Sequence, residues 1–177
     1  MNQLIDLRAQ IDAFMQGHPQ SPLSREQRHN FSGLNYYEAN DAFSFIVDVE
    51  RFPDDEPLFE METSTGDLRQ YRRYGRISFQ VNGEEAQLII YSDRHGQDFF
   101  LPFRDATSGK DTYGAGRYMD NHRPALTPLA NDQFQIDFNF AYNPYCAYNP
   151  NYSCPLPPRE NWLSVAIEAG EKNFEPH

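Results

Sequence analysis

The dipeptide Asn82-Gly83, set between two runs of alternating apolar residues, constrains the fold of this chain more than any other feature. A two-residue type I′ turn needs positive φ at both central residues, and Asn followed by Gly adopts that conformation readily. The dipeptide therefore predicts an antiparallel hairpin in which residues 77–81 pair with residues 84–91. Its register places five side chains on one face, which we expect to meet the core. They are Ile77, Phe79, Ala86, Leu88 and Ile90.

Short runs in which apolar and polar residues alternate recur along the rest of the chain, with turn residues between them. We expect further strands at residues 43–50, 58–63, 99–103, 117–119, 134–140 and 163–167. Two Asn-Pro turns and the proline-rich run from Cys154 to Pro158 suit neither a helix nor a central strand. The pattern predicts a mainly β fold, an antiparallel β-sandwich or partly closed barrel with an N-terminal helical extension. An α+β fold is the alternative.

The first 30 residues have helical rather than strand periodicity. Their apolar residues follow helical spacing up to Gly17, a stop signal, and are Leu4, Leu7, Ile11, Phe14 and Met15. Ser24 and Gln27 match a capping box and predict a second, short helix. A chain of 177 residues is long enough for one sizeable core. We therefore expect a helical extension over residues 1–30 and one β-rich domain over residues 31–177.

The charge balance restricts the partners of the protein. There are 26 acidic and 15 basic residues, a net charge of −11 that repels phosphate backbones and anionic membranes. No apolar run approaches the roughly 20 residues of a membrane helix, and the N-terminus lacks the pattern of a signal peptide. We expect a cytoplasmic protein that binds neither nucleic acid nor membranes. The oligomeric state does not follow from the sequence.

Two cysteines, Cys146 and Cys154, are present, and their C-x7-C spacing differs from the C-x2-C of a zinc knuckle. We therefore expect no metal site. A reactive thiol needs a basic neighbour that lowers its pKa, and no histidine lies in the surrounding motif. We expect two buried, inert thiols with a structural role, and whether they pair stays open.

Motifs spread over nearly the whole chain resemble those of the domain of unknown function 1684 family of bacterial and archaeal proteins. They include Ser21-Pro22-Leu23, Phe100-Leu101-Pro102-Phe103, Thr112-Tyr113-Gly114, Gly116-Arg117-Tyr118, Asp137-Phe138-Asn139, Ala141-Tyr142-Asn143-Pro144, Cys146-Ala147-Tyr148, Cys154 to Pro158 and Ala169-Gly170-Glu171-Lys172. The resemblance implies no reaction, cofactor or catalytic residue. Function must therefore be argued from side-chain chemistry.

The densest polar grouping lies within these motifs and forms the candidate ligand site. Its members are Asp105, Thr107, Thr112, Arg117, Tyr118, Asp137, Asn139, Tyr142 and Asn143. The Arg117 guanidinium offers a planar fork of donors for a carboxylate or phosphate. The alternative is an internal network in which Arg117 pairs with Asp105 or Asp137, because buried charges must be paired. In either case we expect Arg117 to contact one of these two carboxylates.

Standard enzyme templates are absent from the sequence. There is no G-x-S-x-G elbow and no glycine-rich loop that follows a strand to bind phosphate, and no cofactor is indicated. Our leading hypothesis is a small-molecule binding module with a polar pocket around Arg117 and Asp137 for a small polar ligand. An enzyme with an unusual active site in the same region, or a structural or interaction protein, are the alternatives. We expect residues 168–172 to be solvated, although Gly170-Glu171 could close a pocket.

Overall fold

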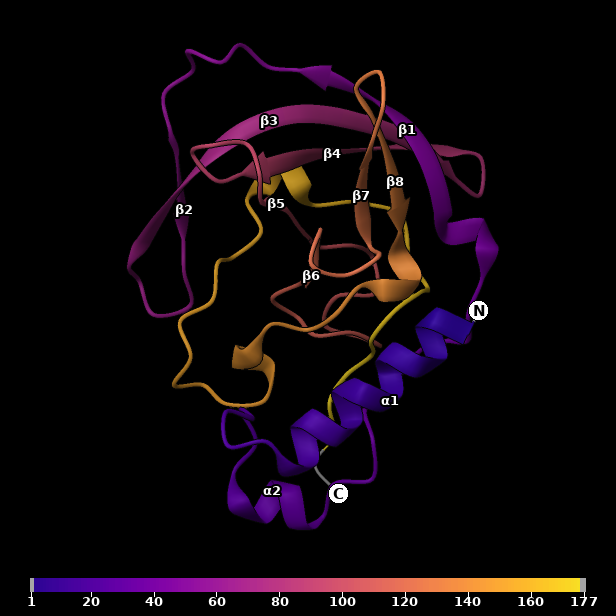
Figure 1. The fold of residues 1–177 in the computed structure, drawn as a ribbon, viewed down its shortest axis with the longest axis vertical. Helices are drawn as coiled ribbons and strands as arrows, with labels where there is room; N and C mark the ends of the chain where they lie inside the picture. The colour runs from indigo at the N-terminus through magenta and orange to yellow at the C-terminus, as the bar shows by residue number, and fades with distance from the viewer. Residues whose placement is uncertain (1, 176–177) are drawn as a thin grey trace.

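A curved antiparallel sheet forms most of the protein and wraps into a nearly closed barrel (Figure 1). The computed structural model describes residues 2–175. Neighbouring strands follow the order β6-β5-β4-β3-β1-β8-β7, and β2 pairs with the start of β3. The strands are β1 (Ser44–Arg51), β2 (Phe59–Glu62), β3 (Leu68–Val81), β4 (Glu84–Ser92), β5 (Phe99–Phe103), β6 (Arg117–Asp120), β7 (Leu126–Leu129) and β8 (Gln133–Asp137). The mainly β prediction is confirmed.

The β3–β4 hairpin has the predicted turn and register. Asn82 and Gly83 have φ values of 51° and 82°, as the type I′ turn requires. Ile77 lies opposite Leu88, and Phe79 lies opposite Ala86. All five residues of the predicted apolar face are buried. The long β3 also pairs with β1 and β2, so this hairpin connects the two halves of the sheet.

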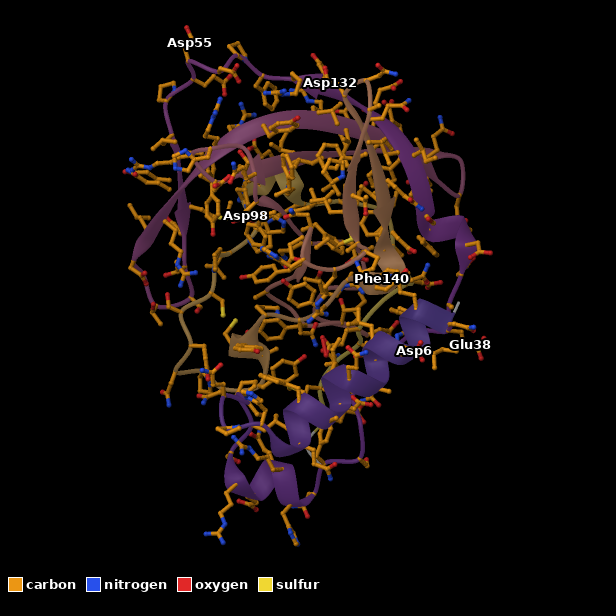
Figure 2. All side chains as sticks on the ribbon, viewed as in Figure 1. Asp6, Glu38, Asp55, Asp98, Asp132 and Phe140 are labelled. Atoms are coloured by element: carbon orange, nitrogen blue, oxygen red, sulfur yellow. The ribbon has the colours of Figure 1, made fainter. Side chains whose placement is uncertain are left out.

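Apolar side chains fill the barrel, whereas acidic side chains such as Asp55 and Asp132 point outward (Figure 2). The aromatic rings of Phe79 and Phe103 pack against Phe138. The C-terminal segment adds Val165, Ile167 and Ala169 to the same core. A second cluster, centred on Met61, Ile89 and Tyr91, lies between the hairpin and β2.

Helix α1 (Asn2–Gly17) crosses below the barrel, and the short α2 (Arg25–His29) follows it (Figure 1). Leu4 joins the main core, whereas Met15 packs with Leu23 and Tyr148 in a separate small cluster. Ser24 and Gln27 form the predicted capping box of α2. Among residues 2–175, no helix has the length and apolar character that a membrane crossing requires.

Several predictions about the strands need correction. β3 begins at Leu68 and not at residue 77. Residues 163–167 form an extended segment and not a strand, because their backbone bonds go to loop residues, as from the Ala106 N–H to the Val165 carbonyl. β8 ends at Asp137, since the Asp137 carboxylate accepts the Asn139 N–H and starts a 3-10 turn at Phe138–Phe140. Residues 126–129, where the sequence predicts no strand, form strand β7, at an edge of the sheet where proline is tolerated.

Candidate functional site

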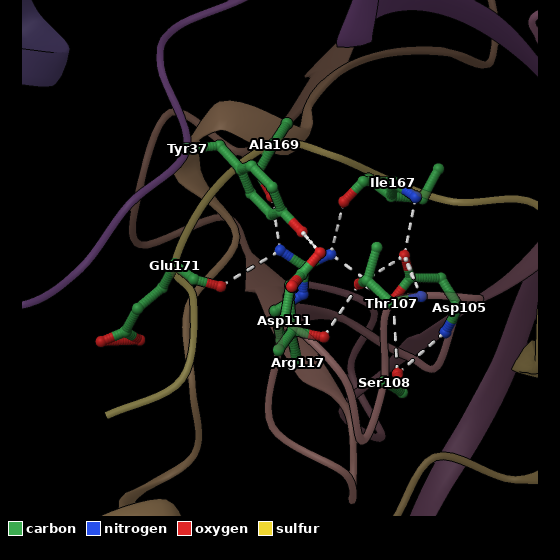
Figure 3. A network of polar contacts seen from close by, with 10 residues as sticks. Tyr37, Asp105, Thr107, Ser108, Asp111, Arg117, Ile167, Ala169 and Glu171 are labelled. Atoms are coloured by element: carbon green, nitrogen blue, oxygen red, sulfur yellow. Dashed lines mark hydrogen bonds and ion pairs between the residues drawn. The ribbon is translucent and has the colours of Figure 1, made fainter. Parts of the chain in front are cut away.

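Arg117, on β6, is completely buried and holds the C-terminal segment in place (Figure 3). Its guanidinium donates hydrogen bonds to the backbone carbonyls of Ile167, Ala169 and Glu171. The same group lies 3.5 Å from the Asp105 carboxylate, so the predicted contact with one of the two carboxylates is confirmed. Burial lowers the pKa of Arg117, and Asp105 opposes that shift.

The loop after β5 supplies the rest of this network. The Asp105 carboxylate accepts hydrogen bonds from the Thr107 and Ser108 hydroxyls and from the Ile167 N–H at 2.6 Å. The Thr107 and Thr112 hydroxyls lie 2.9 Å apart. Four of the predicted site residues therefore form one internal network, in which they hydrogen-bond to one another and to the backbone. They are Asp105, Thr107, Thr112 and Arg117.

The other predicted residues lie in different surroundings. Tyr118 is buried and donates to the Pro155 carbonyl. Asp137 and Asn139 share one neighbourhood, where Asn139 Nδ2 donates to the Asp137 carboxylate and to the Asn40 carbonyl. Tyr142 and Asn143 instead line a cavity beneath α1. The predicted site residues thus divide into four neighbourhoods.

Glu171 links the Arg117 network to this cavity. Its backbone carbonyl faces Arg117, while its carboxylate points away from the network (Figure 3). Gly170 permits this path with a φ of +81°, and a Cβ there would lie 2.7 Å from the Phe138 carbonyl oxygen. The expectation that residues 168–172 are solvated is wrong for residues 169–171, which are buried, and Glu171 is only 2% exposed.

The cavity has a volume of about 290 Å³ and lies between α1 and the turns that follow β8. We call it the α1 cavity. Side chains of α1 and Leu34 give it an apolar wall, and the turns and the C-terminal segment give it a polar wall. The lining residues are Leu7, Gln10, Ile11, Phe14, Met15, Leu34, Tyr36, Arg123, Tyr142, Asn143, Tyr145, Tyr148 and Glu171.

Burial raises the pKa of the Glu171 carboxyl to about 7. The Tyr148 hydroxyl and the Asn143 N–H donate to the two carboxylate oxygens and oppose this rise, as do Arg123 and Arg117. A carboxyl group with this pKa holds a proton in about half of the molecules at neutral pH. The ionised form can accept a hydrogen bond from a ligand in the cavity, and the protonated form can donate one.

Arg123 is the cationic residue among those that line the α1 cavity. Its guanidinium stacks 3.7 Å from the centre of the Tyr142 ring and makes no hydrogen bond or ion pair with any residue of the described chain. Asn143, which is buried, leaves its Oδ1 atom without a partner among residues 2–175. The α1 cavity therefore offers a cationic donor that the protein itself does not use, beside a residue with an unpartnered buried oxygen.

Sequence reasoning missed the central groups of this cavity. The sequence places Glu171 in a family motif and in a segment that we expect to be solvated, and it indicates no role for Arg123. No local signal identifies Arg123, because its neighbours, Tyr142 and α1, are remote in sequence.

Fold and site together define a mostly β protein with a nearly closed antiparallel sheet and a cavity covered by its N-terminal helix. The chain belongs to the family described as Protein of unknown function (DUF1684), whose sequence profile matches residues 29–172. It is similar to an uncharacterised protein of Haloarcula marismortui solved by NMR in solution, with 34% identity and a TM-score of 0.72. The match covers 99% of this chain and 95% of that one. No curated protein matches the chain.

Proposed function

We propose that this protein is a small-molecule binding module whose ligand is an organic acid with an apolar body, held in the α1 cavity. The observation that carries the proposal is Arg123, a guanidinium stacked on Tyr142 without an ion-pair partner in residues 2–175, at the edge of a cavity. A planar guanidinium is well suited to a carboxylate, which it can bind through two parallel hydrogen bonds.

The site is proposed at the α1 cavity rather than around Arg117 and Asp137. The Arg117 guanidinium is fully buried and already bonded to three backbone carbonyls and Asp105. A ligand there would have to replace those interactions, and breaking a buried ion pair is costly. Tyr142 and Asn143 keep their predicted role as ligand contacts in this proposal.

The two walls of the cavity support an amphipathic ligand. Leu7, Ile11 and Phe14 of α1 offer an apolar surface, against which a hydrocarbon or aromatic group loses contact with water. Across the cavity lies the polar side chain of Asn143, whose buried Oδ1 atom has no partner among residues 2–175. A volume of about 290 Å³ lies at the low end of ligand pockets, and this favours a compact molecule.

Glu171 makes the proposed binding depend on pH. An anionic ligand is repelled by an ionised Glu171 and tolerated by a protonated one. Since the pKa of Glu171 is about 7, affinity for a carboxylate should increase as the pH falls from 8 to 6. The charged and titratable groups around Glu171 are Arg8, Arg117, Arg123, Tyr36 and Tyr148. Burial raises the pKa of the Tyr36 and Tyr148 hydroxyls, so both stay neutral over this range.

Ligand-observed NMR with 3-phenylpropionate, and with its uncharged amide as the comparison, tests the proposal. We expect saturable binding of the carboxylate, weaker binding of the amide, and at least tenfold weaker carboxylate binding by Arg123→Ala. Arg159→Ala is the matched control, because Arg159 also stacks on an aromatic ring, that of Trp162, but lies outside the cavity. Equal binding by wild type and Arg123→Ala would refute this site.

A further inference from the structure

Cys146 and Cys154 lie side by side although they are eight residues apart. Cys146 belongs to the 3-10 turn Tyr145–Ala147, and its backbone N–H donates to the Cys154 Sγ atom at 3.3 Å. Cys154 is anchored to the β2–β3 turn, because its N–H donates to the Ser64 hydroxyl and its carbonyl accepts the Ser64 N–H. Both thiols are free.

The surroundings of the two sulfur atoms differ. Cys154 is buried, whereas Cys146 is half-buried, so the expectation of two buried thiols is correct only for Cys154. The Tyr113 hydroxyl donates to the Cys146 Sγ atom at 3.6 Å. Hydrogen bonds from Cys154, Tyr113 and Ser64 lower the pKa of the Cys146 thiol, and the bond to Cys146 raises the pKa of Cys154. Neutral hydroxyl and thiol donors thus take the place of the basic neighbour that sequence reasoning required.

We propose that Cys146 and Cys154 form a redox-active dithiol that reacts with low-molecular-weight disulfides, with Cys146 as the attacking thiol and Cys154 as the resolving thiol. The assignment follows from their adjacency, the hydroxyl donor on Cys146 and the greater exposure of Cys146. It does not depend on the proposed ligand in the α1 cavity.

The reaction is a pair of thiol–disulfide exchanges. The Cys146 thiolate attacks one sulfur of a disulfide such as oxidised glutathione, forms a mixed disulfide and releases one glutathione thiolate. The Cys154 sulfur then attacks Cys146 Sγ, releases the second glutathione, and gives its proton to that leaving thiolate. The protein loses two hydrogen atoms, that is two protons and two electrons, and one oxidised glutathione becomes two reduced ones.

The position of the dithiol connects it to the α1 cavity. Tyr145 precedes Cys146 in the same turn, and both Tyr145 and Tyr148 line the cavity. Oxidation closes a ring through residues 146–154 and fixes this turn against Cys154. The redox state of the two cysteines therefore affects the position of the turn that contributes Tyr145 and Tyr148 to the cavity wall.

Intact-mass measurement of the folded protein after treatment with oxidised glutathione at pH 7 tests the proposal. We expect wild type to lose two hydrogen atoms and retain no glutathione. Cys154→Ser should retain one glutathione on Cys146, because the resolving thiol is missing. Cys146→Ser should react at least tenfold more slowly, and Tyr113→Phe should slow the wild-type reaction several-fold.

Circular dichroism of each variant checks that it is folded before the reaction. The proposal is overturned if the folded wild type does not react while the protein unfolded in urea does. It is also overturned if Cys146→Ser takes up glutathione as fast as Cys154→Ser, because the two thiols would then not have distinct roles. Conversion of the folded wild type to the internal disulfide, with a trapped adduct only in Cys154→Ser, supports it.

Discussion

The Arg117 network and the α1 cavity lie on opposite sides of the same C-terminal segment and use their charged groups differently. Arg117 is fully buried, and its terminal nitrogens are occupied by carbonyls of residues 167–171 and by Asp105. Arg123 stacks on Tyr142 and is bonded to no other group of residues 2–175. Arg117 and Arg123 thus differ: the chain bonds the terminal nitrogens of the first guanidinium internally and leaves the second without a hydrogen-bond acceptor among residues 2–175.

The difference depends on which groups surround each arginine. Around Arg117, the loop after β5 and the extended segment 167–171 provide acceptors for both terminal nitrogens of the guanidinium, while its Nε has no partner among residues 2–175. Around Arg123, the chain provides an aromatic face and a cavity, but no acceptor within hydrogen-bonding distance among residues 2–175. Because the Arg117 network fixes the backbone of Glu171, it also determines where the Glu171 carboxylate lies in the cavity.

The largest expected effect is on the network. Arg117→Ala leaves the Asp105 carboxylate buried without its cation, which should lower the free energy of unfolding by about 3–5 kcal/mol. Urea denaturation measures this change. Adding Asp105→Asn to Arg117→Ala should recover part of the loss. A single variant within about 1 kcal/mol of wild type would contradict the structural role.

The next effect concerns the protonation of Glu171. Because the folded-state pKa of about 7 lies above the ordinary 4.5, folding stabilises the protonated form. That contribution is complete below pH 4.5 and is lost as the pH rises to 7, a change of roughly 3 kcal/mol. Glu171→Gln should lack this slope when unfolding is compared with wild type at each pH. Parallel curves for the two proteins would exclude a buried, titrating Glu171.

A smaller effect is expected for the hydroxyl that faces Glu171. Tyr148→Phe removes a hydrogen bond that lowers the pKa of Glu171, so this pKa should rise above 7. The lost hydrogen bond should cost roughly 1–2 kcal/mol of stability at neutral pH. Tyr145→Phe is the matched control, because Tyr145 also lines the cavity but its hydroxyl has no hydrogen-bond partner in residues 2–175. If both variants changed the Glu171 pKa and the free energy of unfolding equally, the hydrogen bond from Tyr148 to Glu171 would be contradicted.

The smallest effect on stability is expected at Arg123. Arg123→Ala removes a stacking interaction and should change the free energy of unfolding by less than about 1 kcal/mol. Thermal denaturation of Arg123→Ala, with Arg159→Ala as the control, measures this change in stability. A loss as large as that of Arg117→Ala would show that Arg123 also has a structural role, and the contrast between the two arginines would fail.

The hairpin could be predicted because its determinants are local. Asn82-Gly83 sets the turn, and the turn sets the register of Ile77 with Leu88. The sequence predicts that Arg117 pairs with one of two carboxylates, since buried charges require partners. The choice of Asp105 was not predictable, because Asp137 caps the turn at Asn139, a competing local interaction.

The α1 cavity could not be predicted, because its two walls come from opposite ends of the chain. Glu171 follows a segment with strand-like alternation, but its backbone bonds reach Arg117, 54 residues away. Its burial also requires Tyr148 and the polar turns beside α1, which no pattern near Glu171 reveals. Long-range contacts of this kind leave little trace in local periodicity.

The most direct test of the α1 cavity as a ligand site is the pKa of Glu171, measured by carboxyl ¹³C NMR with and without 3-phenylpropionate. We expect a value near 7 in the free protein and a higher value when the anion is bound, because two neighbouring negative charges disfavour each other. Glu171→Gln identifies the resonance by its loss. A pKa near 4.5, or one that saturating 3-phenylpropionate leaves unchanged, would contradict the assignment of this cavity.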